Sequence, residues 1–191
     1  MNKKIIGIFV CTLLIATALT ATGAIKLQTN SYVKENNYFE PNKNTATNSP
    51  DFITIKIVTK VDEVHDPYNL LGGAINVNDT VTGKYTYDSE TPDTYPDDLG
   101  VGVYWQNSSS CGIEVKAGGF VFKTNASDID FAIGIFDNAP YYYDSYVVVS
   151  NKNLPLSNGM LVELIYWWLC DETCTVLSSD TLPTTAPKLS I

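Results

Sequence analysis

Alternation of apolar and polar residues is the feature that most constrains this chain. In "FITIKIVTKV" (52–61), isoleucine occupies every second position from Ile53 to Ile57, and the residues between are Thr54 and Lys56. Successive side chains of a strand point to opposite faces, so a period of two predicts a half-buried β-strand. The segment therefore predicts a sheet with one face on a core.

The same signature recurs along the rest of the chain. Gly-, Ser- or Asp-rich turn signals separate the segments at intervals of about ten residues, which is typical of sandwiches. "MLVELIYWWLC" is apolar on both faces, as expected of a strand covered on each side; a helix, with Leu161, Leu164, Ile165 and Trp168 on one side, is the alternative. We expect an all-β fold, an antiparallel β-sandwich or jelly roll. Its further strands are expected at 79–88, 100–106, 111–117, 119–123, 129–137, 141–150 and 160–170.

The N-terminus has the layout of a secretory signal peptide. Lys3 and Lys4 precede an apolar run from Ile5 to Leu19, and small residues follow up to Ala24. We expect cleavage after Ala24, with an uncleaved membrane anchor as the alternative. Residues 25–50 are rich in Asn, Thr and Lys without periodicity and predict a flexible spacer. The expected organisation is a leader at 1–24, a spacer at 25–50 and a β-sandwich domain at 51–191, secreted or held at the cell surface.

The charge of the chain limits its partners. The net charge is −9 at pH 7, and loss of the two leader lysines would take it to about −11. The chain contains no arginine. Binding of nucleic acid requires clustered Lys and Arg against phosphates, so nucleic acid is not an expected partner. An acidic exported surface suits cations or neutral ligands such as glycans and other cell-surface components.

Three cysteines would remain after export. Outside the cytosol we expect at least one disulfide among Cys111, Cys170 and Cys174. A Cys170–Cys174 bridge requires a tight turn at 171–173, because the extended chain separates the two Cα atoms too far. Either of the two could instead pair with Cys111. Zinc binding by these cysteines and His65 is disfavoured because no CxxC pair is present.

Several motifs together resemble an exported β-domain of prokaryotic secreted proteins, some of which carry a Pro-Glu-Pro C-terminal sorting tail. The resemblance spans roughly residues 55–190 and implies a β-sandwich and export, but no activity. The chain departs from the pattern because the tail is absent and because it ends at Ile191, where a further strand is expected. The matching elements are Gly83, Tyr85, Tyr87 and Asp88; Thr91, Pro92 and Asp93; Gly118, Gly119 and Phe120; and 182–185.

An acidic loop is the candidate metal site. "YDSETPDTYPDD" (87–98) supplies hard oxygen donors of the kind Ca²⁺ takes from flexible loops. The candidate ligands are Asp88, Asp93, Asp97 and Asp98. Their spacing is not that of an EF-hand, and Asp, Pro, Ser and Thr are also ordinary turn residues. A solvated turn is thus the alternative interpretation, and no other cofactor is expected.

An aromatic stretch is the candidate glycan site. Tyr141, Tyr142 and Tyr143 precede Asp144, so rings for sugar stacking would stand beside a carboxylate for sugar hydroxyls. Packing of these rings in the core is the alternative. Catalysis has little support, since His65 is the single histidine and no G-x-S-x-G motif occurs. We therefore expect a non-catalytic structural or adhesive module, with glycan or calcium binding as the alternative and an extracellular hydrolase third.

Overall fold

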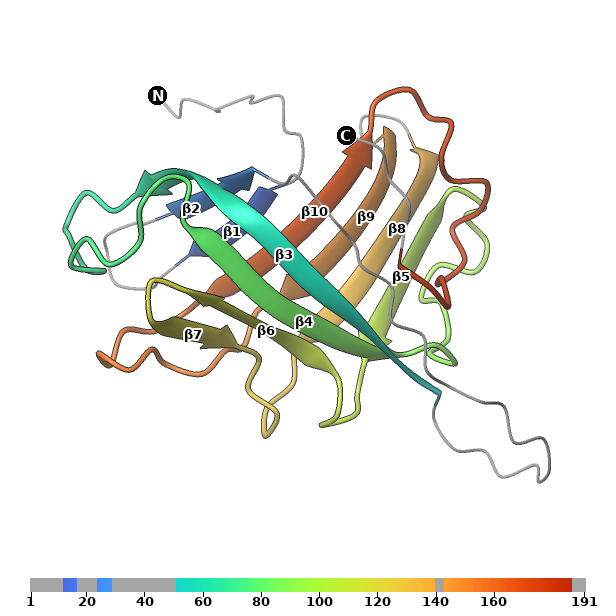
Figure 1. Cartoon of the computed structure of the whole chain (residues 1–191). Coiled ribbons are helices and arrows are strands. Elements are labelled where there is room, and N and C mark those ends of the chain that lie inside the picture. Colours follow the sequence, from blue (N-terminus) through green and yellow to red (C-terminus); the bar gives the residue numbers. More distant parts are fainter. Residues whose placement is uncertain (1–11, 17–23, 29–50, 140–142, 187–191) are drawn as a thin grey trace, which may run out of the picture.

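The structure is a computed structural model that describes residues 12–16, 24–28, 51–139 and 143–186. Within these ranges the chain forms strands and no helix, so the predicted all-β sandwich is confirmed. From residue 51 onward, eight strands make two four-stranded antiparallel sheets packed face to face (Figure 1). The first sheet has the order β3 (Phe52–His65), β4 (Thr80–Asp88), β6 (Gly112–Ala117) and β7 (Phe120–Lys123). The second has the order β5 (Val101–Gln106), β8 (Phe131–Ala139), β9 (Tyr143–Ser150) and β10 (Leu164–Asp171).

Two short strands join the sheets at one side. β1 (Thr12–Ala16) pairs antiparallel with β10, β2 (Ala24–Gln28) pairs with β3, and the two pair with each other. The hydrogen-bonded order is therefore continuous from β5 to β7. These strands fall in the predicted leader and at the start of the predicted spacer, where no strand was expected. The other residues of those two segments lie outside the described part of the chain.

The core lies between the sheets, and the alternation seen in the sequence places it there. On the second sheet the pairings align three inward rows, which begin at Gly102, Tyr104 and Gln106 on β5 and end on β10. On the first sheet the inward residues of β3 and β4 are the alternating apolar ones. Most of these inward side chains are buried, and burial follows the predicted period of two on β3, β4, β5 and β10. On β8 and β9 consecutive residues are buried on both faces.

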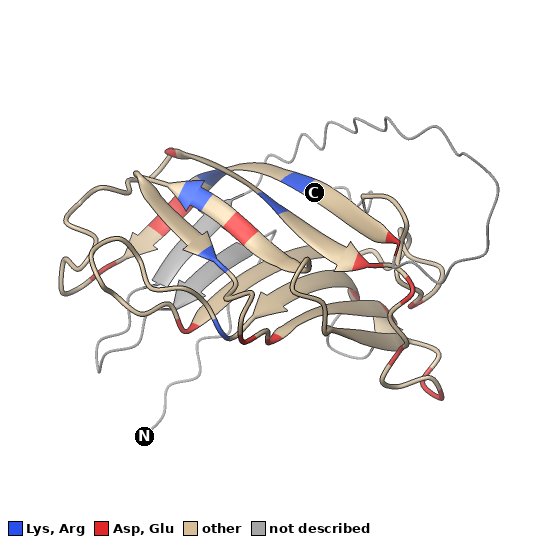
Figure 2. Cartoon of the chain, turned by 90° about the horizontal axis from the view of Figure 1, so that it is seen from below, with Lys and Arg blue, Asp and Glu red and all other residues tan. Residues whose placement is uncertain are grey.

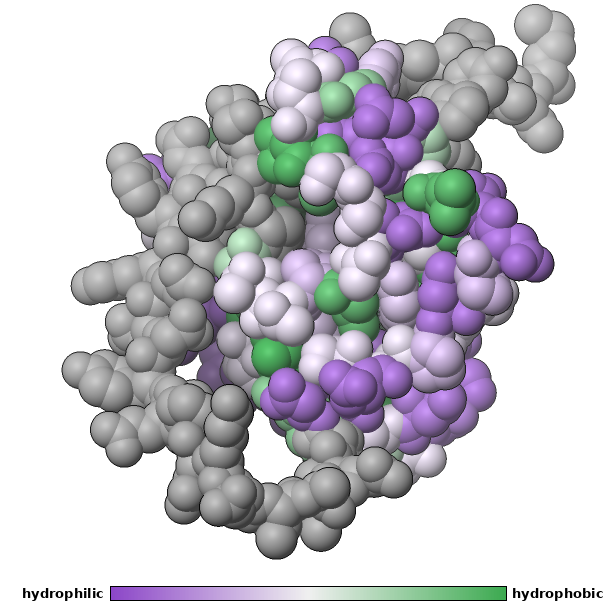
Figure 3. Space-filling view, turned by 90° about the vertical axis from the view of Figure 1, so that its right-hand side faces the viewer, coloured by the Kyte–Doolittle hydropathy of each residue, from purple (hydrophilic) through white to green (hydrophobic). Residues whose placement is uncertain are grey.

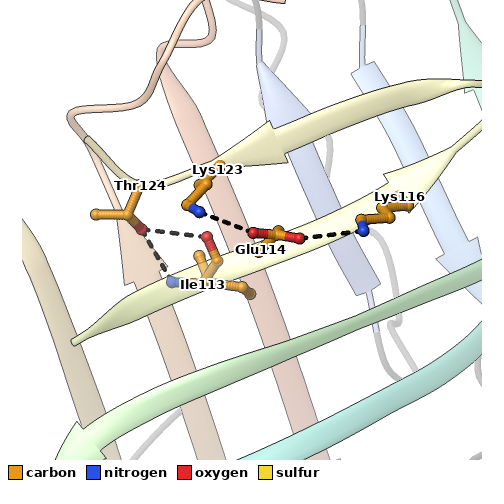
Figure 4. A network of polar contacts seen from close by, with 5 residues as sticks. All are labelled: Ile113, Glu114, Lys116, Lys123 and Thr124. Atoms are coloured by element: carbon orange, nitrogen blue, oxygen red, sulfur yellow. Dashed lines mark hydrogen bonds and ion pairs between the residues drawn. The ribbon is translucent and has the colours of Figure 1, made fainter. Parts of the chain in front are cut away.

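The outer face of the first sheet is polar. Glu114 on β6 pairs with Lys123 Nζ at 2.9 Å and with Lys116 Nζ at 3.3 Å (Figure 4). The same view shows Thr124, which follows β7, accepting the Ile113 N–H at 3.0 Å. Since Glu114 also lies opposite Lys84 on β4, charged side chains run across this face. A solvated outer face of this kind is ordinary for an antiparallel sheet.

From residue 51 onward, strand boundaries agree with the sequence analysis to within two residues except at β3, which continues past the predicted end at Val61 to His65, and at the start of β10. The predicted strand 160–170 begins at Leu164, because residues 160–163 follow a turn in which the Gly159 N–H donates to the Leu156 carbonyl. β10 is a strand, so the helical alternative is wrong. Of the described residues, none forms a helix long and apolar enough to cross a membrane.

Candidate functional site

The outer face of the second sheet is the feature that stands out. Strand pairing aligns its outward side chains in three rows that begin at Val101, Val103 and Trp105 on β5 and run through β8 and β9 to β10. None of the aligned residues carries a charge, and all except one serine are apolar or glycine. They are Val101, Phe136, Ser145 and Cys170; Val103, Gly134, Val147 and Trp168; and Trp105, Ala132, Val149 and Tyr166, with Leu164 beyond them. We call this set the apolar outer face.

The two outer faces of the sandwich therefore differ in chemistry. Figure 2 shows acidic and basic residues along the strands of the upper layer, which is the first sheet, whereas the second sheet has acidic residues only at strand ends. Those end residues are Asp137, Asp144 and Asp171. A sandwich whose outer surfaces served only solubility would carry charges on both. The outer face of the second sheet is therefore the less polar of the two.

The apolar outer face is accessible mainly along its two outer strands. The Trp105 side chain is 43% exposed on β5, and Tyr166 on β10 is half-buried, whereas Ala132 on β8 and Ser145 and Val147 on β9 are buried. Within the face the side chains pack on one another: a Cβ placed on Gly134 would lie 3.1 Å from the Phe136 ring, so that ring covers the glycine. Contiguous apolar surface on a folded domain marks contact sites for proteins or membranes. This face is the candidate functional site.

Part of the signal for this face lies in the sequence. "LIYWWLC" was interpreted as a strand covered on both sides. The neighbouring segments "GVGVYW", "FAIGIF" and "YVVV" are apolar at every position as well. Such runs differ visibly from the alternating pattern of β3. Only the strand order shows that all four lie side by side.

The acidic loop is held in shape by its own carboxylates. Asp88 Oδ1 accepts the Glu90 N–H at 3.1 Å, and Asp98 Oδ1 accepts the Gly100 N–H at 3.1 Å. Asp93 Oδ1 accepts N–H groups from Tyr95 and Val103 at 3.0 and 2.8 Å, which ties the loop to the free edge of β5. These are turn-forming roles of aspartate.

No metal cluster is apparent in the described ranges. Among them, no group of three or more His, Cys, Asp or Glu could hold a metal ion. Asp97 is exposed, and His65 is exposed at the end of β3. The calcium site at Asp88, Asp93, Asp97 and Asp98 stays a prediction, which a comparison of melting temperature in calcium and in chelator would test.

The predicted glycan residues divide between surface and core. Tyr143 begins β9 and is 46% exposed, whereas Tyr141 and Tyr142 lie outside the described residues. Asp144 is fully buried. Its Oδ1 accepts the Asn138 N–H at 3.0 Å, and its Oδ2 accepts the N–H groups of Val176 and Leu177 at 2.9 and 2.8 Å. Asp144 anchors the end of β8 and the segment after β10 and does not face solvent, so Tyr143 is the described member of the set that a ligand could reach.

The cysteines do not form the expected disulfide in the structure. Cys111, Cys170 and Cys174 are all free thiols. Cys111 is buried in the core, where its Sγ lies 3.3 Å from Gln106 Oε1, and burial raises its pKa. The tight turn required for a Cys170–Cys174 bridge is present, because the Cys174 N–H donates to the Asp171 carbonyl at 3.3 Å.

The Asp171 carboxylate stabilises that turn. It accepts the N–H groups of Thr173 and Thr175 at 3.0 and 3.1 Å and both threonine hydroxyls. The hydrogen bond from the Thr173 hydroxyl, followed by the one from the Thr175 N–H, lowers the pKa of Asp171. Cys170 and Cys174 thus stand at the two ends of a well-defined turn beside the apolar outer face.

Comparison with known proteins found no matching family model, no similar curated protein and no similar solved structure.

Proposed function

We propose that this protein is an exported, non-catalytic β-sandwich module of the cell surface, structural or adhesive in role, that makes contact through the apolar outer face. The observation that carries the proposal is the uncharged surface formed by β5, β8, β9 and β10. The leader-like N-terminus supports export, and the polar outer face of the first sheet supplies the side that stays in water.

The chemistry of the surface defines the kind of contact. Burial of apolar area stabilises an association by roughly 25 cal/mol per Å² removed from water, before the entropy of association is subtracted. Trp105, Tyr166 and Trp168 are of the residue types that dominate binding energy at protein interfaces. With no charge on the face, long-range attraction has little part in the contact, and its strength should depend weakly on salt.

A pair of matched substitutions tests the proposal. Trp105→Lys places a charge on the apolar outer face, and Val58→Lys places one on the first sheet, where Val58 is 49% exposed. Both residues stand on strands and are accessible, so neither lysine is forced into the core. A lysine buried unpaired in a contact costs several kcal/mol, which lowers affinity by more than about tenfold.

The readout is the distribution of the protein between envelope and medium in the cells that make it. Wild type and Val58→Lys should fractionate with the envelope, and Trp105→Lys should shift to the medium. Melting temperatures of the purified variants show whether each is folded. Equal retention of both folded variants would refute the apolar outer face as the working surface, and accumulation of the wild type in the medium would refute a cell-surface role.

A further inference from the structure

The chain segment after β10, residues 172–186, closes one end of the sandwich, and we call it the closing segment. The Tyr104 hydroxyl donates to the Asp180 carbonyl at 2.9 Å, and the Tyr87 hydroxyl donates to the Pro183 carbonyl. Leu182 between them is buried in the core. In Figure 1 this segment is the red loop beyond β10. Contacts with both sheets thus hold it in place, although it is not itself a strand.

A cavity lies between this segment and the second sheet. Its volume is about 310 Å³, and two buried side chains of the sheet, Ile135 and Tyr146, line it. From the closing segment come Leu177, Thr181, Pro183, Thr185 and Ala186, of which the two threonines are exposed. The cavity therefore extends from the core to the surface. Figure 3 views the side of the molecule that carries this segment and β5, where apolar patches alternate with polar residues.

The size of the cavity indicates the size of a ligand. An engineered apolar cavity of about 150 Å³ admits benzene, so 310 Å³ is roughly twice that room. Pockets for small molecules begin at about 300 Å³. A single substituted or fused ring fits this volume, whereas a chain of sugars does not.

The wall of the cavity contains one unusual polar group. The Tyr146 side chain is fully buried, and among the described residues its hydroxyl has no hydrogen-bond partner of normal geometry. The ring lies beside Tyr85, with centroids 6.2 Å apart, and Tyr85 stacks on Tyr87 at 6.1 Å. Burial, followed by the neighbouring Tyr85 and Tyr87 hydroxyls, raises the pKa of Tyr146 well above its usual value. A buried hydroxyl that lacks a well-formed hydrogen bond is unfavourable and can pair with a bound polar group.

We propose that this cavity binds a small, uncharged and largely apolar molecule with one hydroxyl or carbonyl group that pairs with the Tyr146 hydroxyl. Every other wall residue is apolar or a threonine, so a ligand charge would find no counter-charge. The site is formed by the inner face of the second sheet and is separate from the apolar outer face. The proposal therefore stands without the function proposed above.

Two probes that differ by one hydroxyl test the site. The full chain is titrated with 4-methylphenol and with toluene, and heteronuclear NMR follows the methyl groups of Ile135, Leu177 and Ala186. We expect saturable shifts at these methyls and tighter binding of 4-methylphenol by about three- to tenfold, the contribution of one hydrogen bond. Tyr146→Phe should make the two probes bind equally.

A cavity-filling variant and a control complete the design. Ala186→Trp should abolish binding of both probes, and Val121→Trp, at an exposed position on β7, should leave it unchanged. Shifts confined to other methyl groups, or no saturable shift up to the solubility of either probe, would overturn the site even if Ala186→Trp failed to fold. A tenfold preference for 4-methylphenol that persists in Tyr146→Phe would overturn the role given to the hydroxyl.

Discussion

Replacement of Asp144 by asparagine should release the closing segment from the sandwich. Oδ1 accepts one backbone N–H and Oδ2 accepts two, all between 2.8 and 3.0 Å. Asparagine keeps one acceptor oxygen and puts an NH₂ group in place of the other. If the amide oxygen keeps accepting the Asn138 N–H, the N–H groups of Val176 and Leu177 lose their acceptor and face the NH₂ group, which is a donor.

The magnitude follows from those contacts. A hydrogen bond to a charged group contributes roughly 1.5–3 kcal/mol, so loss of two gives about 3–6 kcal/mol before the segment relaxes. Because the segment can move toward water and recover solvation, we expect the free energy of unfolding to fall by the lower end of this range, about 3 kcal/mol. For a chain of this size that corresponds to a fall in melting temperature of roughly 6–12 °C. Urea denaturation gives the same free energy independently.

Hydrogen exchange locates the effect. The amides of Val176 and Leu177 should exchange much faster in Asp144→Asn, while those of β8 and β9 follow only the loss of global stability. Asp128→Asn is the matched control, because Asp128 is an exposed carboxylate paired with Lys152 at 2.7 Å and should leave the melting temperature unchanged. A melting temperature within about 2 °C of wild type, with unchanged exchange at 176 and 177, would refute the anchoring role.

Three further changes have expected outcomes. In the folded state the hydrogen bond from Lys123, and to a smaller extent the one from Lys116, lowers the pKa of Glu114. The stabilisation by these contacts is therefore present above the pKa that Glu114 has in the unfolded chain, and it is lost as the pH falls through the pKa that Glu114 has in the folded protein. The margin of wild type over Glu114→Gln, about 0.5 kcal/mol at pH 7, should shrink toward zero in thermal melts as the pH falls below the ordinary glutamate range, and a constant margin would contradict the ion pairs. Iodoacetamide should modify Cys174 in the native protein and the buried Cys111 only after unfolding, as mass spectrometry of peptides would show; native modification of Cys111 would argue against its burial. Gly102→Ala should destabilise by about 1–3 kcal/mol in urea, because the new Cβ would lie 2.4 Å from the Asp180 carbonyl oxygen, and full stability would show that the closing segment is loosely held.

Much of the fold was predictable from local pattern. Alternation placed β3 and β4 within a few residues and identified which side of each faces the core, because the side-chain period of an extended chain is fixed at two. The same reasoning misplaced the start of β10, since residues 160–163 are rich in apolar side chains but follow a turn. It also gave no indication of β1, whose residues have the composition of a leader.

The candidate sites were less predictable. Asp88, Asp93 and Asp98 have the composition of a calcium loop, yet each carboxylate in the structure accepts backbone N–H groups of its own loop. Asp144 sits beside three tyrosines in the sequence, but its partners come from residues 138, 176 and 177. The aspartate carboxylate offers the same two oxygens in a turn, in an anchor or in a metal site. Composition alone therefore does not separate these roles.

The sequence by itself determined an acidic, arginine-free chain of alternating strands, because net charge and side-chain period need no knowledge of which strands pair. The tertiary structure alone decided that β4 pairs with β6 and that β5 pairs with β8 in the other sheet. Those pairings place four apolar segments side by side as an uncharged outer surface, and they bring residues 177–186 over Tyr146 to leave a cavity. Both features depend on contacts between residues far apart in the chain, and local pattern carries no information about such pairings.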